Sequence, residues 1–365
     1  MRLNRRALLV WSAYGGAAWA GLGGKAARAA VFRDPLHYPA LKYDGLDRRP
    51  LQGVVAAGSR FVAVGLRGLV IYSADNGVTW TQARCPVQSD LLAVDFPSPM
   101  LGWIVGHDGV ILHSRDGGHS WEKQLDGVES AKTFVNYVER PGVAADVSAS
   151  LRLLQENVRV PASLPYLSVR FADEKRGLAV GSFGMAARTE DGGQTWIPAL
   201  EEFQGLRGLN LNAIGSNDLI AAEQGVVYRP SDSGGGRNSF TGVATPAKGS
   251  YYGIANNSSV SVAFGLRGEI ARSTDVGQTW VMAKSRSNWS IFAGCALPND
   301  KGFILVNSIG EVLHSDTDGQ IFNRLDAPSA QLKIGEPTGA IALLGGREIL
   351  ISGLGGIQKV SLSLS

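Results

Sequence analysis

The chain has 365 residues and a formal net charge of +3. This length exceeds the size at which one hydrophobic core keeps growing, and 47 glycines fit a chain of many turns. Residues 1–29 hold five of the 35 basic residues and none of the 32 acidic ones. The rest of the chain therefore carries 30 basic against 32 acidic residues. This balance, without a basic stripe or aromatic platform, argues against nucleic acid as a partner.

The first 29 residues have the pattern of an export signal. Arg5 and Arg6 precede an uncharged stretch over residues 7–24, and Ala27-Arg28-Ala29 resembles a cleavage site. The paired arginines and the mild hydrophobicity predict a cleaved twin-arginine signal and a periplasmic location in a bacterium. The uncharged stretch is just long enough to span a bilayer, so an uncleaved anchor is the alternative.

A repeated unit organises residues 51–365. Each copy joins a Gly-x-x-Gly turn, a short apolar strand and an Asp turn of the form Ser/Thr-x-Asp-x-Gly-x-Thr-Trp. Clear copies span residues 65–80, 106–121, 181–196 and 265–280, and worn copies span 222–240, 307–322 and 353–362. A period of about forty residues is typical of a propeller or solenoid. Seven copies predict an all-β fold, a seven-bladed β-propeller.

The Asp turns are predicted to be structural. A short carboxylate accepts backbone N–H groups of its own turn, a glycine adopts a positive φ, and a tryptophan packs over the hairpin. The residues expected to do this are Asp75, Trp80, Asp116, Trp121, Asp191, Trp196, Asp275 and Trp280.

Two segments depart from the repeat. Residues 30–50 form a lead-in, and we expect Pro39–Leu46 to supply the outer strand that the seventh blade lacks, which would close the ring. Residues 126–165 form an insertion between the second and third blades. It is predicted to contain an amphipathic helix, which docks on the propeller or faces a partner. The residues at helical spacing are Val147, Leu151, Leu154 and Val158, with Pro161 closing the run.

The remaining reactive residues form no recognisable site. Cys85 and Cys295 fall in the first and sixth blades, which are not neighbours, so we expect free thiols. The five histidines are scattered, and neither they nor the cysteines have the spacing of a metal or redox site. No cofactor and no metal are predicted.

A binding face follows from the order of the strands. In a four-stranded blade, the Gly-x-x-Gly turns share one face with the connections between blades, and the Asp turns lie on the opposite face. Loops on a rigid scaffold commonly carry function, and arginine and aromatic residues are frequent at binding hot spots. The predicted binding residues are Arg67, His107, Asp108, Phe183, Glu223 and Arg267. Asp95 and Arg170, at matching positions of adjacent inner strands, are predicted to pair across a blade interface.

The two turns in register resemble the photosystem II stability/assembly-factor family, a group of bacterial neuraminidase (Asp-box) repeat propellers. Gly102-Trp103-Ile104-Val105-Gly106 and Phe264-Gly265-Leu266-Arg267-Gly268 are similar to an exported branch of non-photosynthetic bacteria, often encoded beside resistance-nodulation-division transporters. The resemblance implies a non-enzymatic factor that binds a client during assembly. The expected client is an envelope protein, such as a membrane transporter or a complex subunit, bound by a monomer. Pro230 and Thr317 depart from the Asp-turn consensus.

Two other functions stay open on the sequence. Sialidases share Asp boxes, and residues 32–35, Phe-Arg-Asp-Pro, superficially resemble their Phe-Arg-Ile-Pro motif. This copy lacks the isoleucine and precedes every blade. No pair of carboxylates with the pattern needed for glycoside hydrolysis is recognisable in the sequence. The second alternative is a lectin-like glycan binder.

Overall fold

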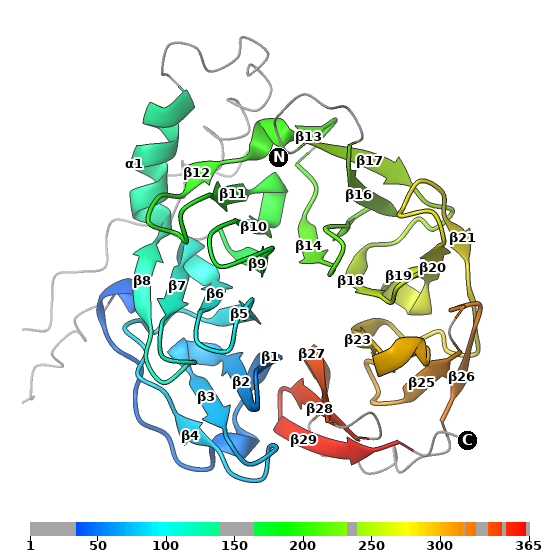
Figure 1. Ribbon diagram of the computed structural model, residues 1–365, viewed down its shortest axis with the longest axis horizontal. Coiled ribbons are helices and arrows are strands. Elements are labelled where there is room, and N and C mark those ends of the chain that lie inside the picture. Colours follow the sequence, from blue (N-terminus) through cyan, green and yellow to red (C-terminus); the bar gives the residue numbers. More distant parts are fainter. Residues whose placement is uncertain are drawn as a thin grey trace, which may run out of the picture. The chain divides into compact units, whose positions relative to one another are not determined.

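The apolar runs between the glycine turns form short strands, which the structure arranges as sheets around a central axis (Figure 1). This computed structural model describes residues 34–138, 164–206, 208–231, 239–316, 318–325, 335–344 and 348–362. Within those ranges there are seven sheets, which we call blades one to seven in chain order. Six of them hold at least four strands, and the last holds three.

The first four blades follow the order of the chain from the inside outwards. Their strands are β1 (Leu51–Ala57), β2 (Arg60–Gly65), β3 (Val70–Ser73) and β4 (Thr81–Gln82); β5 (Leu91–Asp95), β6 (Gly102–Gly106), β7 (Ile111–Ser114) and β8 (Glu122–Leu125); β9 (Tyr166–Phe171), β10 (Gly177–Gly181), β11 (Ala186–Thr189) and β12 (Ile197–Pro198); and β14 (Leu211–Ile214), β15 (Ile220–Ala222), β16 (Val226–Pro230) and β17 (Phe240–Ala244).

Blades five to seven repeat this order. Their strands are β18 (Tyr251–Asn256), β19 (Ser261–Gly265), β20 (Ile270–Ser273) and β21 (Val281–Met282); β23 (Ile291–Ala296), β24 (Phe303–Asn307), β25 (Val312–Ser315) and β26 (Ile321–Arg324); and β27 (Pro337–Leu344), β28 (Glu348–Gly353) and β29 (Gly356–Ser361). Each inner strand contacts the next inner strand, and β27 contacts β1, so the ring closes. The predicted all-β propeller is confirmed.

Several outer edges are covered by the chain that leaves the preceding blade. β13 (Phe203–Gln204) pairs in parallel with β17, and β22 (Lys284–Ser285) pairs in parallel with β26. Between the first two blades, Arg84 makes a parallel bridge to Ser120. Because an unpaired strand edge is a template for aggregation, these short additions protect the blades and also tie neighbours together.

The lead-in does not supply the predicted closing strand. Residues 39–45 follow the outer side of blade one, where Gln82 donates to the carbonyl of Leu41 at 2.7 Å and accepts from the amide of Tyr43 at 3.0 Å. The 3₁₀ turn η2 (Leu46–Arg48) contacts β29. The lead-in therefore covers the seam between the first and last blades with side chains and a turn rather than with ladder hydrogen bonds.

The insertion begins with a helix that the sequence analysis did not place. α1 (Gly127–Val138) follows β8 directly, and the Asp126 carboxylate accepts the amides of Val128 and Glu129 at 3.0 and 2.9 Å, as an N-cap does. The predicted helix at Val147–Val158 lies outside the described residues. α1 contacts β12 and the Gly-x-x-Gly turn η4 (His107–Gly109), so it stands on the face where blade connections and these turns meet.

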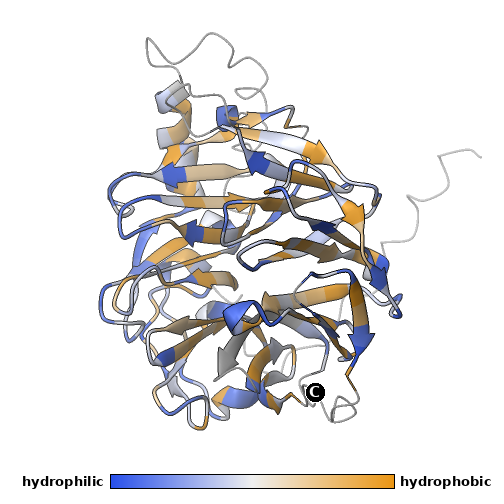
Figure 2. Ribbon diagram, turned by 45° about the vertical axis from the view of Figure 1, so that its right-hand side comes forward, coloured by the Kyte–Doolittle hydropathy of each residue, from blue (hydrophilic) through white to orange (hydrophobic). Residues whose placement is uncertain are grey.

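The core is divided among the interfaces between blades. One cluster, for example, joins buried residues of blades two and three, and Trp103 stacks on Phe171 with ring centroids 3.6 Å apart. Figure 2 shows apolar residues concentrated in the strands and hydrophilic residues in the turns. Such packing of each blade against the next stabilises a ring without one large central core.

Candidate binding face

The Gly-x-x-Gly turns share one unusual geometry. In blade one, Arg67 has a φ of 56° and Gly68 a φ of 73°, and the amide of Leu69 donates to the carbonyl of Leu66 at 3.2 Å. This is a type I′ hairpin turn, which favours Asn-Gly because both central residues need positive φ. The same position has positive φ in blades two to five, where it holds Asp108, Phe183, Gln224 and Arg267. Arginine and phenylalanine are therefore locally unfavourable residues at these turn tips.

Side chains of the following blade hold these tips in place. The amide of Arg67 donates to the Asp90 carboxylate at 2.8 Å. In the same way, Asn210 accepts from Phe183 at 2.8 Å, and Ser290 accepts from Arg267 at 3.1 Å. Each accepting residue precedes the inner strand of the next blade. The neighbouring blade thus helps to fix the turn conformation, in addition to the glycines that the turn itself requires.

The first glycine of the turn is required by close packing. A Cβ atom on Gly65 would lie 2.1 Å from the carbonyl oxygen of Pro50, and one on Gly106 would lie 2.2 Å from that of Asp90. The two oxygens belong to the chain entering the inner strand of the same blade. They also accept the amides of Leu66 and His107 at 3.4 and 2.8 Å. The glycines therefore permit the inner strand to dock on the turn.

The six predicted binding residues lie on this face, but in two different states. Arg67, His107 and Arg267 are exposed, and Phe183 is 56% exposed. Asp108 and Glu223 are half-buried and already bonded. Asp108 accepts the Ser89 hydroxyl at 2.7 Å, and Glu223 accepts the backbone and side-chain amides of Asn210 at 3.0 and 3.1 Å. The last two residues support the turns, so the accessible set is the other four.

Exposed apolar side chains extend this face beyond the predicted set. Ile309 and Leu354 occupy the corresponding turns of blades six and seven and are 52% and 44% exposed. Trp289, in the connection between blades five and six, is 54% exposed. The sequence analysis missed Trp289 because it lies outside the repeated motif. Connections between blades lie on the same face as the Gly-x-x-Gly turns. The position of Trp289 in such a connection is therefore the signal that could have placed it on this face.

The opposite face carries the Asp turns, which are self-contained. The Asp75 carboxylate accepts the hydroxyls of Thr79 and Ser73 and the amides of Val78 and Thr79. The hydrogen bonds from Thr79, followed by that from Ser73, lower the pKa of Asp75 to about 2. Trp121 and Trp280 each donate their indole N–H to a glycine carbonyl of the same turn at 3.2 Å. These contacts support the expectation that the Asp turns are structural.

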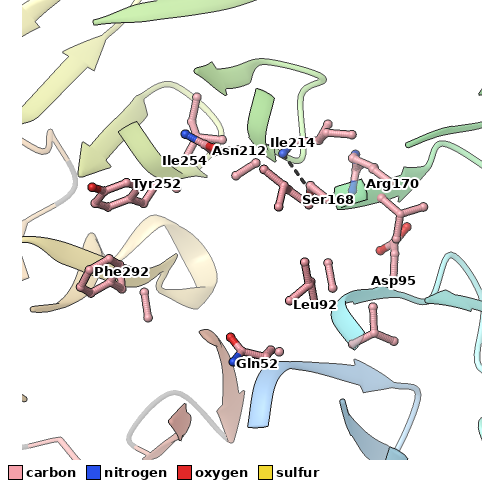
Figure 3. A pocket seen from close by; sticks show the side chains of 18 of the residues that line it. Gln52, Leu92, Asp95, Ser168, Arg170, Asn212, Ile214, Tyr252, Ile254 and Phe292 are labelled. Carbon is pink, nitrogen blue, oxygen red and sulfur yellow. Dashed lines mark hydrogen bonds between the residues drawn. The ribbon is translucent and has the colours of Figure 1, made fainter. Parts of the chain in front are cut away.

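A central cavity of about 410 Å³ runs between the inner strands (Figure 3). Asp95 and Arg170 line it, but the predicted ion pair between them is not formed. Asp95 accepts the amide of Phe171 at 2.7 Å. Arg170 donates to the carbonyl of Ser216 at 2.8 Å and lies 3.4 Å from the Asp218 carboxylate. Each residue therefore bonds to the blade that follows its own in the chain.

Groups with shifted pKa values have structural explanations. Burial raises the pKa of Glu202 to about 7, against the opposing effect of its ion-pair partner Arg188. Burial also raises the pKa of the free thiols Cys85 and Cys295 to about 12. None of these residues lines the central cavity, whereas Asp95, which does line it, has its pKa raised by burial. The described part of the chain holds no cluster of three His, Cys, Asp or Glu side chains suited to a metal ion.

Among the residues that the structure describes, no helix combines the length and apolar character needed to cross a bilayer.

The fold and the two kinds of turn define an Asp-box β-propeller whose opposite faces differ in their residues. Comparisons with known proteins give this class a family context. A family model described as photosynthesis system II assembly factor YCF48 matches residues 59–142. The photosystem II assembly protein Ycf48 of Synechococcus sp. (strain JA-3-3Ab) is 28% identical over 272 residues, which cover 67% of this chain and 77% of the relative.

Two further comparisons also give proteins named as YCF48 or HCF136. The photosystem II stability/assembly factor HCF136 of Cyanidioschyzon merolae (strain NIES-3377 / 10D) is 32% identical over 98 residues, covering 25% of this chain and 22% of the relative. A solved structure of YCF48 bound to a D1 peptide has a TM-score of 0.61 at 16% identity, and covers 91% of this chain and 99% of its own. The chain is therefore similar to the non-enzymatic Ycf48/HCF136 assembly factors.

Proposed function

We propose that the chain is an exported assembly or stability factor that binds a protein of the cell envelope on its Gly-x-x-Gly face. The observation that carries this proposal is the set of exposed Arg67, Phe183 and Arg267 at turn tips with positive φ. These residue types are disfavoured at such tips, so turn stability does not explain them; three of the seven Gly-x-x-Gly turns show this, against Val276 alone among the four clear Asp turns. Residues that the surrounding structure holds in an unfavourable backbone conformation often lie at functional sites.

The chemistry of this face favours a polypeptide. Arg67 and Arg267 present cations, while Phe183, Trp289, Ile309 and Leu354 present apolar surface. Arginine and aromatic side chains are the residues most enriched at protein-binding hot spots. The related YCF48 structure contains a D1 peptide, which supports a membrane-protein subunit as the class of client for this propeller.

Co-purification tests the proposal. The tagged chain is cross-linked in envelope extracts, captured and eluted, and the captured proteins are identified by mass spectrometry. We expect a specific envelope protein, and we expect Arg67→Ala/Phe183→Ala/Arg267→Ala to lose it. The matched control on the opposite face is Val78→Ala/Val276→Ala, whose side chains are 69% and 60% exposed. Release by free sugar would instead favour a glycan binder, and equal loss with both variants would contradict the proposed face.

The location is a separate part of the proposal. If Arg5 and Arg6 direct twin-arginine export, then Arg5→Lys/Arg6→Lys should leave the chain in the cytoplasm in unprocessed form. Fractionation followed by N-terminal sequencing measures both outcomes. Periplasmic recovery of this variant would contradict the twin-arginine route.

A further inference from the structure

A β-bulge recurs at the same place in six of the seven inner strands. In β1, Leu51 pairs with Gly65 and Gly53 pairs with Val64, so Gln52 has no partner opposite it. The register of β5, β9, β14, β18 and β23 shifts in the same way after the first residue of each strand. We call the six extra residues the bulge ring; they are Gln52, Leu92, Leu167, Asn212, Tyr252 and Phe292.

The bulge ring lies at the end of the central cavity nearest the Gly-x-x-Gly turns. Each bulge follows a strand residue that pairs beside the start of a turn, as Leu91 does with Gly106 and Tyr251 with Gly265. All six ring residues line the cavity, and Figure 3 shows labelled side chains from several inner strands around the same open space. Bulges re-aim side chains and are frequent beside functional sites. Six blades therefore direct one residue each to a common opening.

Around the opening, the bulge ring consists of two pairs of apolar side chains with an amide side chain before each pair. Leu92 and Leu167, from adjacent blades, supply an aliphatic wall. Tyr252 and Phe292, also from adjacent blades, stack with ring centroids 5.0 Å apart and an interplanar angle of 17°. All four side chains are half-buried rather than fully buried. The opening thus offers two apolar walls in partial contact with water.

Two amides separate the apolar walls. Asn212 donates its Nδ2 to the carbonyl of Tyr251 at 2.7 Å, which leaves its Oδ1 as an acceptor. The Gln52 side chain forms no hydrogen bond with any described residue. None of the six ring residues is charged, and the charged lining residues Asp95 and Arg170 already bind neighbouring blades. An amide can both donate to and accept from a peptide group.

We infer that the bulge ring is a specificity site that receives an uncharged aromatic or aliphatic side chain, carried on an extended segment of the client polypeptide. The apolar side chain packs between the leucine wall and the aromatic wall, and the peptide groups next to it bond to Gln52 and Asn212. The cavity volume is within the range of about 300 to 1,000 Å³ typical of ligand pockets. This inference rests on the proposed function for its client, although the site itself is defined without it.

The first test uses small probes and no client. Protein-observed NMR with the purified, ¹⁵N-labelled protein compares N-acetyl-phenylalanine amide and N-acetyl-leucine amide with N-acetyl-lysine amide and N-acetyl-aspartate amide. The apolar probes should bind and shift the side-chain NH₂ signals of Gln52 and Asn212, whereas the charged probes should not. Binding of all four probes alike, or of none, would overturn the inference.

Variants localise the binding. Tyr252→Ala/Phe292→Ala should weaken the apolar probes about tenfold, because it removes one wall of the opening. Val78→Ala, at an exposed residue of an Asp turn on the opposite face, should leave probe affinity unchanged. Both variants should keep the wild-type thermal midpoint within a few degrees, since the altered side chains are half-buried or exposed. Unchanged probe affinity in the double variant would refute the site.

The client experiment separates this inference from the proposed function. If the captured client binds Tyr252→Ala/Phe292→Ala as well as it binds wild type, the bulge ring is not its specificity site, and the Gly-x-x-Gly face still stands. If wild type captures no client while the apolar probes bind in the ring, the proposed function fails and the site remains.

Discussion

The two turns of each blade face opposite ways and are stabilised differently. An Asp turn satisfies itself, as Asp116 does by accepting from Ser114 and Ser120 of its own turn at 2.9 Å or less. A Gly-x-x-Gly turn depends on the chain around it, as Arg67 depends on Asp90. A turn held from outside can tolerate residues that it would not select for itself. Under the proposed function, this difference leaves the tips of the Gly-x-x-Gly face available for recognition.

The largest expected effect comes from the glycine that docks on the inner strand. Gly106→Ala places a Cβ 2.2 Å from the Asp90 carbonyl oxygen, so it should destabilise the fold by about 3 kcal/mol or more. The control is Gly45→Ala, which has nothing within 4 Å but has a φ of 62° and should cost about 1 kcal/mol. Urea unfolding measures both. Equal costs would show that backbone conformation, and not packing, selects these glycines.

Acid should weaken the interface beside the Asp turn of blade two. His113 is 6% exposed and stacks on Trp103, and neither of its ring nitrogens bonds to a described residue. Burial, aided by Arg115, lowers its pKa to about 4. Because the unfolded chain binds the proton first, stability should fall by about 2 to 3 kcal/mol as the pH drops from about 6.5 to about 4.

The control for this titration is His113→Phe, which keeps an aromatic ring against Trp103 and cannot be protonated. Unfolding curves of this variant should lose the slope with pH in that window. An unchanged slope would assign the acid sensitivity to other groups.

Removing an Asp-turn carboxylate should have a smaller and local effect. Asp116→Ala loses its bonds to Ser114 and Ser120, which should cost about 1 to 2 kcal/mol, and client capture should be unaffected. Arg115→Ala, at an exposed neighbour, is the control and should change stability little. If Asp116→Ala loses the client without unfolding, the Asp-turn face also takes part in client binding, and the two faces do not differ in function as proposed.

The smallest expected effect has the opposite sign. Arg67→Asn creates the Asn-Gly pair that type I′ turns favour, so it should stabilise the protein by about 0.5 to 1 kcal/mol. Asn76→Ala, at a positive-φ position of an Asp turn, should instead destabilise. Thermal unfolding compares the two. Destabilisation by Arg67→Asn would mean that the arginine serves the turn itself.

Most of the fold could be predicted from the repeat, because both turns have fixed residue requirements. The closing strand was predicted wrongly, because the apolar and polar residues of segment 39–46 suit a strand as well as an irregular segment held by side-chain hydrogen bonds. α1 was missed because its cap, Asp126, belongs to the end of a blade. The bulge ring was invisible in the sequence, since Gln52 and Asn212 differ in type and only strand register shows that they share a position.

The most direct test of the account combines stability and capture in one variant. Arg67→Asn/Phe183→Asn/Arg267→Asn should melt at or above the wild-type temperature and lose the envelope client. Val78→Ala/Val276→Ala should keep the client. If the asparagine variant captures the client as well as wild type does, recognition does not reside on the Gly-x-x-Gly face.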